Sequence, residues 1–172
     1  MAPSERGAQT TGSGDATGGS WTNSGRLGAV WLMALAVGGF GVAAYLTSVH
    51  YAHVALLCSA SGLVNCDKVV TSQFSVVPGT NLPITLPGMA FFLISLGLAV
   101  AQYARPQRIR LRQAHFGWAI LGLLAVFYLV FVELEELHAI CLWCTSVHIM
   151  ILLTVFTTAW RLQPSHEPLT LS

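Results

Sequence analysis

The chain contains four cysteines, arranged in two pairs whose spacing suits thiol–disulfide chemistry. Seven residues separate Cys58 from Cys66, whereas Cys141 and Cys144 form a CxxC motif. A CxxC motif holds two sulfurs close enough to alternate between dithiol and disulfide. A helix N-terminus lowers the pKa of a thiol, and Cys141 stands at the mouth of a very apolar stretch, so we expect it to be the attacking thiolate. Two such pairs in one small protein suggest an electron relay.

The composition indicates that these cysteines belong to a membrane protein. Hydrophobic residues make up 54% of the chain and charged residues only 9%, with a mean hydropathy of +0.65, which is too apolar for a soluble domain. Four long windows contain no Asp, Glu, Lys or Arg, and each can hold the roughly 20 residues that cross a bilayer as a helix. We place the spans at about 27–49, 86–104, 113–132 and 139–160.

These spans predict an all-α integral membrane protein, a bundle of four transmembrane helices that occupies residues 26–161. Helices are expected because backbone groups in lipid must bond within their own segment. Residues 1–25 include fourteen Gly, Ser or Thr and no apolar run, so we expect a disordered tail there. Residues 162–172 form a second short tail.

The distribution of arginines predicts the orientation of the bundle. Four arginines lie between the second and third spans, Arg26 precedes the first span and Arg161 follows the fourth. These positions mark the cytoplasmic side, so both termini are expected inside and both cysteine pairs outside, in the plasma (inner) membrane of a cell. An extracytoplasmic compartment is where disulfides persist.

The outer segment from His50 to Thr85 is expected to carry a short lid helix. Asn65 can cap a helix over residues 66–72 by accepting the free amide hydrogens of its first turn. Pro87 and Gly88 mark the entry to the second span. Glu133, Glu135 and Glu136 are expected to form a solvated outer rim.

Other roles remain open for several of these residues. Four cysteines also fit structural staples or a zinc site, although a disulfide that closes only two residues is a weak constraint and the seven-residue spacing is unusual for zinc. His148, one turn below Cys144, suits either a functional group or a neutral histidine bonded to a neighbouring helix. Gly38, Gly39 and Gly41 indicate a close helix-packing face.

The order of these features resembles the vitamin K epoxide reductase family. The features are an apolar helix, the Cys-x7-Cys loop, Ser72 six residues after the second cysteine, the Pro-Gly entry to a helix with Phe91 and Phe92, and a final helix that opens with CxxC. The resemblance covers roughly residues 27–160 and points to the bacterial branch that is functionally similar to DsbB, without a fused thioredoxin domain. It implies a four-helix bundle that encloses a quinone, with the outer loop as a lid.

The resemblance also implies a role for each site residue. Cys58 accepts electrons from a separate DsbA-like carrier with a thioredoxin fold, Cys66 exchanges with Cys141, and Cys144 passes electrons to a membrane quinone such as menaquinone or ubiquinone. Ser72 donates a hydrogen bond to the quinone. The remaining expected quinone contacts are Phe91, Phe92, Trp143 and His148.

The expected activity is therefore that of a thiol:quinone oxidoreductase that reoxidises an extracytoplasmic disulfide carrier. We expect no metal and no nucleic-acid partner. Two alternatives stay open: reduction of a quinone or its epoxide with thiols as the electron source, and a non-catalytic membrane protein with structural disulfides.

The predicted orientation is testable by labelling. A membrane-impermeant thiol reagent applied to intact, reduced cells should label Cys58, whereas a cysteine introduced at Arg108 should stay unlabelled, because the arginine-rich connection is held inside. The opposite pattern would reverse the orientation and remove the argument about compartment.

Overall fold

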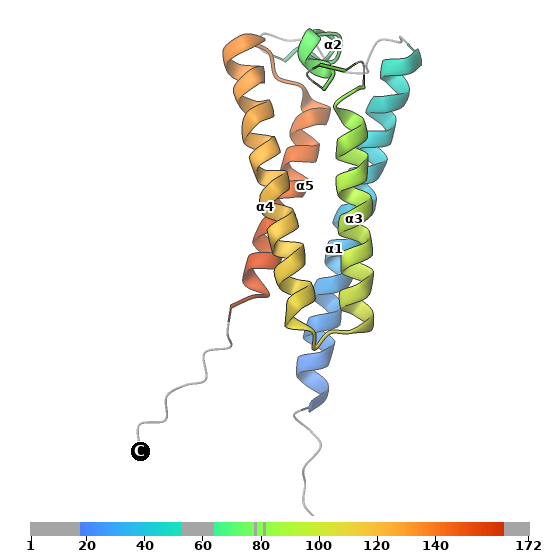
Figure 1. Ribbon diagram of the computed structural model, residues 1–172, viewed down its shortest axis with the longest axis vertical. Helices are drawn as coiled ribbons and strands as arrows, with labels where there is room; N and C mark the ends of the chain where they lie inside the picture. Colours follow the sequence, from blue (N-terminus) through green and yellow to red (C-terminus); the bar gives the residue numbers. More distant parts are fainter. Residues whose placement is uncertain (1–17, 53–63, 78, 81, 164–172) are drawn as a thin grey trace, which may run out of the picture.

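The computed structural model describes residues 18–52, 64–77, 79–80 and 82–163, and four of its helices are long and apolar enough to cross a membrane. They are α1 (Gly18–Ala52), α3 (Thr85–Ala104), α4 (Ile109–Phe131) and α5 (Leu142–Trp160). Figure 1 shows them side by side in one bundle. Helix α1 packs against α3 and α5, and α4 packs against the same two helices, so the four form a closed ring.

The observed helices confirm the four predicted spans and differ from them mainly at their ends. Helix α1 begins at Gly18, inside the segment that we expected to be a disordered tail, because extending an existing helix is easier than starting one. The rest of that tail, residues 1–17, lies outside the described residues. Helix α4 begins at Ile109 rather than at 113. The prediction stopped at the arginines because charge does not suit lipid, but arginine is a good helix former, so the helix continues through them.

Helix α5 begins later than predicted, at Leu142 instead of 139. The preceding residues are held in a different conformation. His138 has a φ of 48°, and Ile140 forms a parallel β-bridge with Val64, reinforced by a 3.2 Å hydrogen bond from the Asn65 amide to the Ile140 carbonyl. This bridge fixes the outer loop directly against the residue before Cys141.

The short helix α2 (Cys66–Val70) lies across the end of the bundle opposite to the α3–α4 connection (Figure 1). Asn65 is its N-cap, as predicted, and its side chain accepts a 3.0 Å hydrogen bond from the Lys68 amide. The helix ends at Val70 rather than at 72. The Thr71 and Ser72 hydroxyls donate to the carbonyls of Asp67 and Val69. These side-chain bonds satisfy carbonyls that a further helical turn would otherwise have paired with backbone amides. The 3₁₀ turn η1 (Gln73–Ser75) follows.

A buried polar cluster joins the helices at the opposite, arginine-rich end. The Arg161 guanidinium donates a 2.6 Å hydrogen bond to the Gln102 side-chain oxygen and a 2.9 Å hydrogen bond to the Gly25 carbonyl. The Gln102 amide nitrogen lies 2.8 Å from Nδ1 of His115. Arg112 completes the cluster with a 3.3 Å bond to the Arg161 carbonyl. Because these bonds connect α1, α3, α4 and the end of α5, they hold that end of the bundle closed.

Two phenylalanines of α3 fill the centre of the bundle because glycines face them. A Cβ atom built on Gly39 of α1 would lie 2.2 Å from the Phe92 ring, and one on Gly122 of α4 would lie 2.5 Å from the Phe91 ring. The predicted glycine packing face is therefore real at Gly39. At Gly41, by contrast, nothing lies within 4 Å of an added Cβ.

This difference gives a matched pair of substitutions. Gly39→Ala should lower the free energy of unfolding by about 1–3 kcal/mol, because the methyl group overpacks a filled core. Gly41→Ala should be neutral or stabilising by up to about 1 kcal/mol, because alanine is the better helix former. Denaturation of the purified protein in mixed micelles measures both, and equal effects of the two changes would contradict the packing described for Gly39.

Candidate functional site

Cys141 caps the N-terminus of α5, as its position in the sequence predicted. Its Sγ accepts a hydrogen bond from the Cys144 amide at 3.3 Å, and its carbonyl accepts from the amide and hydroxyl of Thr145. The side chain is fully buried. The Cys144 thiol and the amides of Cys144 and Trp143 donate to this sulfur and lower the pKa of Cys141, against the opposing effect of burial. The site therefore favours a thiolate at Cys141.

Cys66 is held next to Cys141 in a different redox state. It is the first residue of α2, is 1% exposed, and packs with Cys141, Leu46 and Val49 in one buried cluster. Cys66 is disulfide-bonded, whereas Cys141 and Cys144 are free thiols. Cys58, the other predicted member of the loop pair, lies outside the described residues. The bundle thus brings a disulfide sulfur and a free thiol into the same packed cluster.

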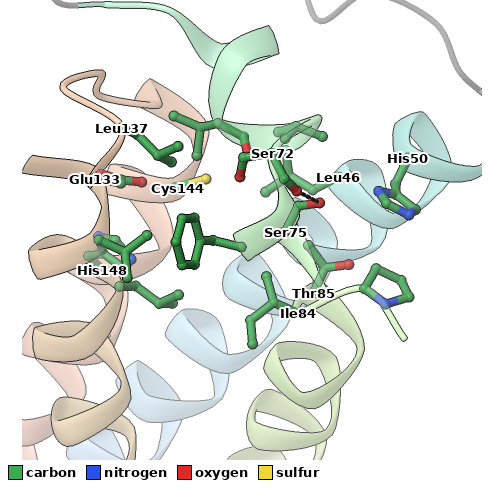
Figure 2. A pocket seen from close by; sticks show the side chains of 16 residues that line it. Leu46, His50, Ser72, Ser75, Ile84, Thr85, Glu133, Leu137, Cys144 and His148 are labelled. Carbon is green, nitrogen blue, oxygen red and sulfur yellow. Dashed lines mark hydrogen bonds between the residues drawn. The ribbon is translucent and has the colours of Figure 1, made fainter. Parts of the chain in front are cut away.

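Cys144 lies where two cavities meet. A small cavity of about 70 Å³ lies under the outer loop, and a larger one of about 410 Å³ runs between α3 and α4. Both are lined by six residues, which are Leu46, Ile84, Thr85, Leu129, Cys144 and His148. Figure 2 shows the Cys144 sulfur facing the small cavity, opposite Ser72. The larger volume lies within the range that drug-sized ligands occupy, and its walls are almost wholly apolar.

The larger cavity reaches the lipid-facing surface. Its wall includes Leu121 and Tyr128 of α4, whose side chains are 55% and 49% exposed. Phe91 also lines it and stacks on Trp118, with ring centroids 5.6 Å apart and planes 14° apart. The Trp118 indole N–H donates a 3.1 Å hydrogen bond to the Phe91 carbonyl, and this bond fixes the aromatic wall. A flat apolar molecule dissolved in the bilayer can enter here without crossing water.

The structure distributes the expected quinone contacts unevenly. His148 lines both cavities, Ser72 lines the small one and Phe91 the large one. The Ser72 hydroxyl donates its proton to the Val69 carbonyl at 2.8 Å, so in this arrangement it can only accept a further hydrogen bond and does not offer the donor expected for a quinone oxygen. Phe92 packs against α1, and Trp143 packs on Tyr45 with ring centroids 4.9 Å apart, and neither lines either of the two cavities described above.

Glu133 is the residue whose position the sequence did not predict. We expected a solvated rim of three glutamates, and Glu135 and Glu136 are indeed exposed, but Glu133 is 7% exposed and lines the small cavity. The end of α4 continues as the π-helical turn η2 (Val132–Glu136), which buries Val132 and Glu133 together. The one available signal was that Glu133 directly follows a charge-free window.

No metal centre accompanies these groups in the part of the chain that the structure describes. Residues 18–52, 64–77, 79–80 and 82–163 contain no group of three or more His, Cys, Asp or Glu side chains placed to hold a metal ion. The disulfide at Cys66 also makes that sulfur unavailable as a zinc thiolate.

The sequence profile of the Vitamin K epoxide reductase family matches residues 30–159 of the chain. The chain belongs to this family. Membership makes it a membrane-embedded oxidoreductase, and members of the family use quinones and generally act with thioredoxin-like partners. No curated protein is a significant match to the chain. The matched range includes α3, α4, α5 and most of α1, so the family fold accounts for the whole ring of helices.

The thiolate of Cys141 can be tested with two substitutions of its neighbour. Cys144→Ser keeps a hydroxyl that can donate to the Cys141 sulfur, whereas Cys144→Ala removes that donor. Loss of a donor to the charged form raises a thiol pKa, so the midpoint of alkylation against pH should lie higher in Cys144→Ala than in Cys144→Ser. Both variants are followed with a small alkylating reagent and mass spectrometry, and identical midpoints would show that the Cys144 side chain does not stabilise the thiolate.

Proposed function

We propose that the protein is a thiol:quinone oxidoreductase that reoxidises an extracytoplasmic thioredoxin-fold carrier and passes the electrons to a membrane quinone. The observation that carries the proposal is the position of the CxxC motif between two different environments. Cys141 packs against disulfide-bonded Cys66, while Cys144 lines a 410 Å³ apolar cavity that reaches the lipid. One motif therefore contacts both a thiol-exchange partner and a place for an apolar acceptor.

The proposed relay begins at the outer loop. A thiolate of the reduced carrier attacks the loop disulfide, proposed to join Cys58 and Cys66, and forms a mixed disulfide that the second carrier thiol resolves. The carrier leaves oxidised and the loop pair reduced. The Cys66 thiolate then attacks Cys141 in the Cys141–Cys144 disulfide, and Cys58 resolves the product. Each exchange breaks one S–S bond and forms another, so electrons move in pairs and none is lost.

The structure has the redox state that follows these exchanges. The loop cysteine Cys66 is oxidised, and the CxxC motif holds two free thiols beside the cavity. In the remaining step the two thiols become a disulfide, and two electrons and two protons leave for the acceptor. A quinone supplies that capacity, since it takes up two electrons and two protons to become a hydroquinone.

The cavity residues fit a quinone. Phe91 and Trp118 offer a flat apolar wall, and the lateral opening beside Leu121 suits an acceptor with a hydrocarbon tail. Two polar groups that can orient a carbonyl oxygen, Thr85 and His148, lie at the junction with the small cavity and line both spaces. A largely apolar site with a few convergent polar groups is the usual form of a small-molecule site.

The proposed orientation places α2 and the cysteines outside and the arginine cluster inside. It is supported by the four arginines at positions 105–112, two in the α3–α4 connection and two in the first turn of α4, at the opposite end of the bundle from α2 (Figure 1). Arg105, directly after α3, and Arg108, directly before α4, have exposed side chains, as inner-leaflet anchors do.

The division of labour between the two CxxC cysteines tests the function. Cys144→Ser should abolish reduction of a short-chain ubiquinone or menaquinone by a reduced thioredoxin-fold protein, yet it should still exchange disulfides with that protein through the loop pair. Ser146→Ala is the matched control, because Ser146 lines neither cavity and its hydroxyl bonds only its own helix at Leu142. Quinone absorbance and alkylation followed by non-reducing gels measure the two activities. Quinone reduction that continues at the control rate in Cys144→Ser would remove the relay.

A further inference from the structure

Glu133 is a buried carboxylate that the electron relay alone leaves without a role. Its side chain is 7% exposed and lines the small cavity next to Cys144, which lines the same cavity (Figure 2). No lysine or arginine lines either cavity among the described residues. A buried carboxylate is costly unless its charge is balanced, and no lysine or arginine is there to balance it. The carboxylate can be neutralised by a proton instead, and the neighbouring Cys144 thiol has one to give.

The backbone holds Glu133 in this position independently of its side chain. The Leu137 amide donates to the Val132 carbonyl at 3.0 Å, which is the π-helical bond of η2, and the Ala139 amide donates to the Glu133 carbonyl at 3.1 Å. Ala139 is two residues before Cys141, so the backbone ties Glu133 to the CxxC motif, and its side chain shares the small cavity with Cys144. Single π-helical turns inside helices occur frequently at functional sites.

The small cavity offers a path for a proton from Glu133 toward the acceptor. Its volume of about 70 Å³ is large enough for several waters, because one water needs roughly 10–15 Å³ of such volume. The hydroxyls of Ser72, Ser75 and Thr85 line it together with the carboxylate, so a water there has polar partners. Thr85 also lines the large cavity, which makes the path continuous with the proposed quinone site.

We propose that Glu133 is a catalytic proton acceptor, which takes the thiol proton of Cys144 during electron transfer and returns it to the reduced acceptor. The inference rests on the proposed function. The balance is simple: two thiols and one quinone give one disulfide and one hydroquinone. The Cys144 proton moves first to the Glu133 carboxylate and then to a quinone oxygen, and the second proton comes from solvent, which replaces the one that Cys141 lost on becoming a thiolate.

The other titratable groups that face this site belong to α1 and to α5 with its N-cap. They are His50 of α1, His148 and Cys144 of α5, and Cys141 at the α5 N-cap. The negative charge of Glu133 disfavours the thiolate form of Cys141. The pH dependence of the reaction will therefore contain contributions besides that of Glu133. A comparison of variants separates them, since only the Glu133 contribution changes when that residue changes.

The first experiment measures single-turnover quinone reduction by the reduced CxxC motif against pH. Glu133→Gln should slow it by about 100-fold or more, the usual cost of removing a general base, and its rate should keep rising at alkaline pH as hydroxide replaces the carboxylate. Glu133→Asp keeps the carboxylate and should recover at least a tenth of the wild-type rate, whereas the exposed Glu135→Gln should match wild type. Disulfide exchange with the carrier should be unchanged in all three variants.

A second readout does not depend on turnover. In a Cys141→Ser background with bound quinone, the Cys144 sulfur cannot close a disulfide, so a thiolate there would leave its proton on Glu133. Infrared spectroscopy should show a protonated-carboxyl band that shifts in D₂O, disappears in Cys141→Ser/Glu133→Gln and persists in Cys141→Ser/Glu135→Gln.

The results separate the two proposals. If wild type and Glu135→Gln transfer no electrons to quinone, the proposed function fails. If they do, and Glu133→Gln stays within about threefold of wild type with the same pH profile, only the proton role fails. Equal impairment of Glu133→Asp and Glu133→Gln, or a carboxyl band that survives Glu133→Gln, would also overturn it by showing that the residue acts through packing.

Discussion

The hydrogen bonds from the start of α5 to the Cys141 sulfur are the interaction on which the rest of the site depends. A helix N-terminus has amides without carbonyl partners, and here the sulfur of Cys141 satisfies one of them in place of the usual Ser or Asp cap. The same contact fixes the start of α5, stabilises the charged form of the sulfur and sets Cys144 one turn deeper. The same hydrogen bonds therefore determine both the start of the helix and the reactivity of the sulfur, so a change to one alters the other.

The β-bridge between Val64 and Ile140 extends this arrangement to the outer loop. Helix α2 is only five residues long and would not be stable alone, because helix nucleation is costly. The bridge and the buried cluster around Leu46 and Val49 hold it against α1 and the CxxC motif. At the other end, the bonds of Arg161 to Gln102 and Gly25 close the bundle. The cavities lie between these two fixed ends, where α3 and α4 separate.

The sequence predicted the features that depend on composition or on local chemistry. Charge-free windows gave the four helices because lipid excludes charge, and Asn65 gave the α2 cap because its side chain acts on its own neighbours. The position of Glu133 could not be predicted in this way. Its burial depends on the π-helical turn and on the bond from Ala139, which form only when α4 and the segment before Cys141 pack together. Trp143 and Phe92 have aromatic rings suited to a quinone, but packing directs one to Tyr45 and the other to Gly39.

In the proposed mechanism, the two cavities give electrons and protons different routes to one place. An apolar cavity suits the ring and tail of a quinone, but protons do not cross an apolar space without carriers. The small cavity supplies hydroxyls and a carboxylate on the outer side of Cys144, and the large one supplies the aromatic wall on its lipid side. Cys144 is the thiol that borders both spaces, whereas Cys141 is sealed among Leu46, Val49 and Cys66. The two sulfurs of the motif are one turn apart, and that single turn separates thiol exchange from the chemistry of the acceptor.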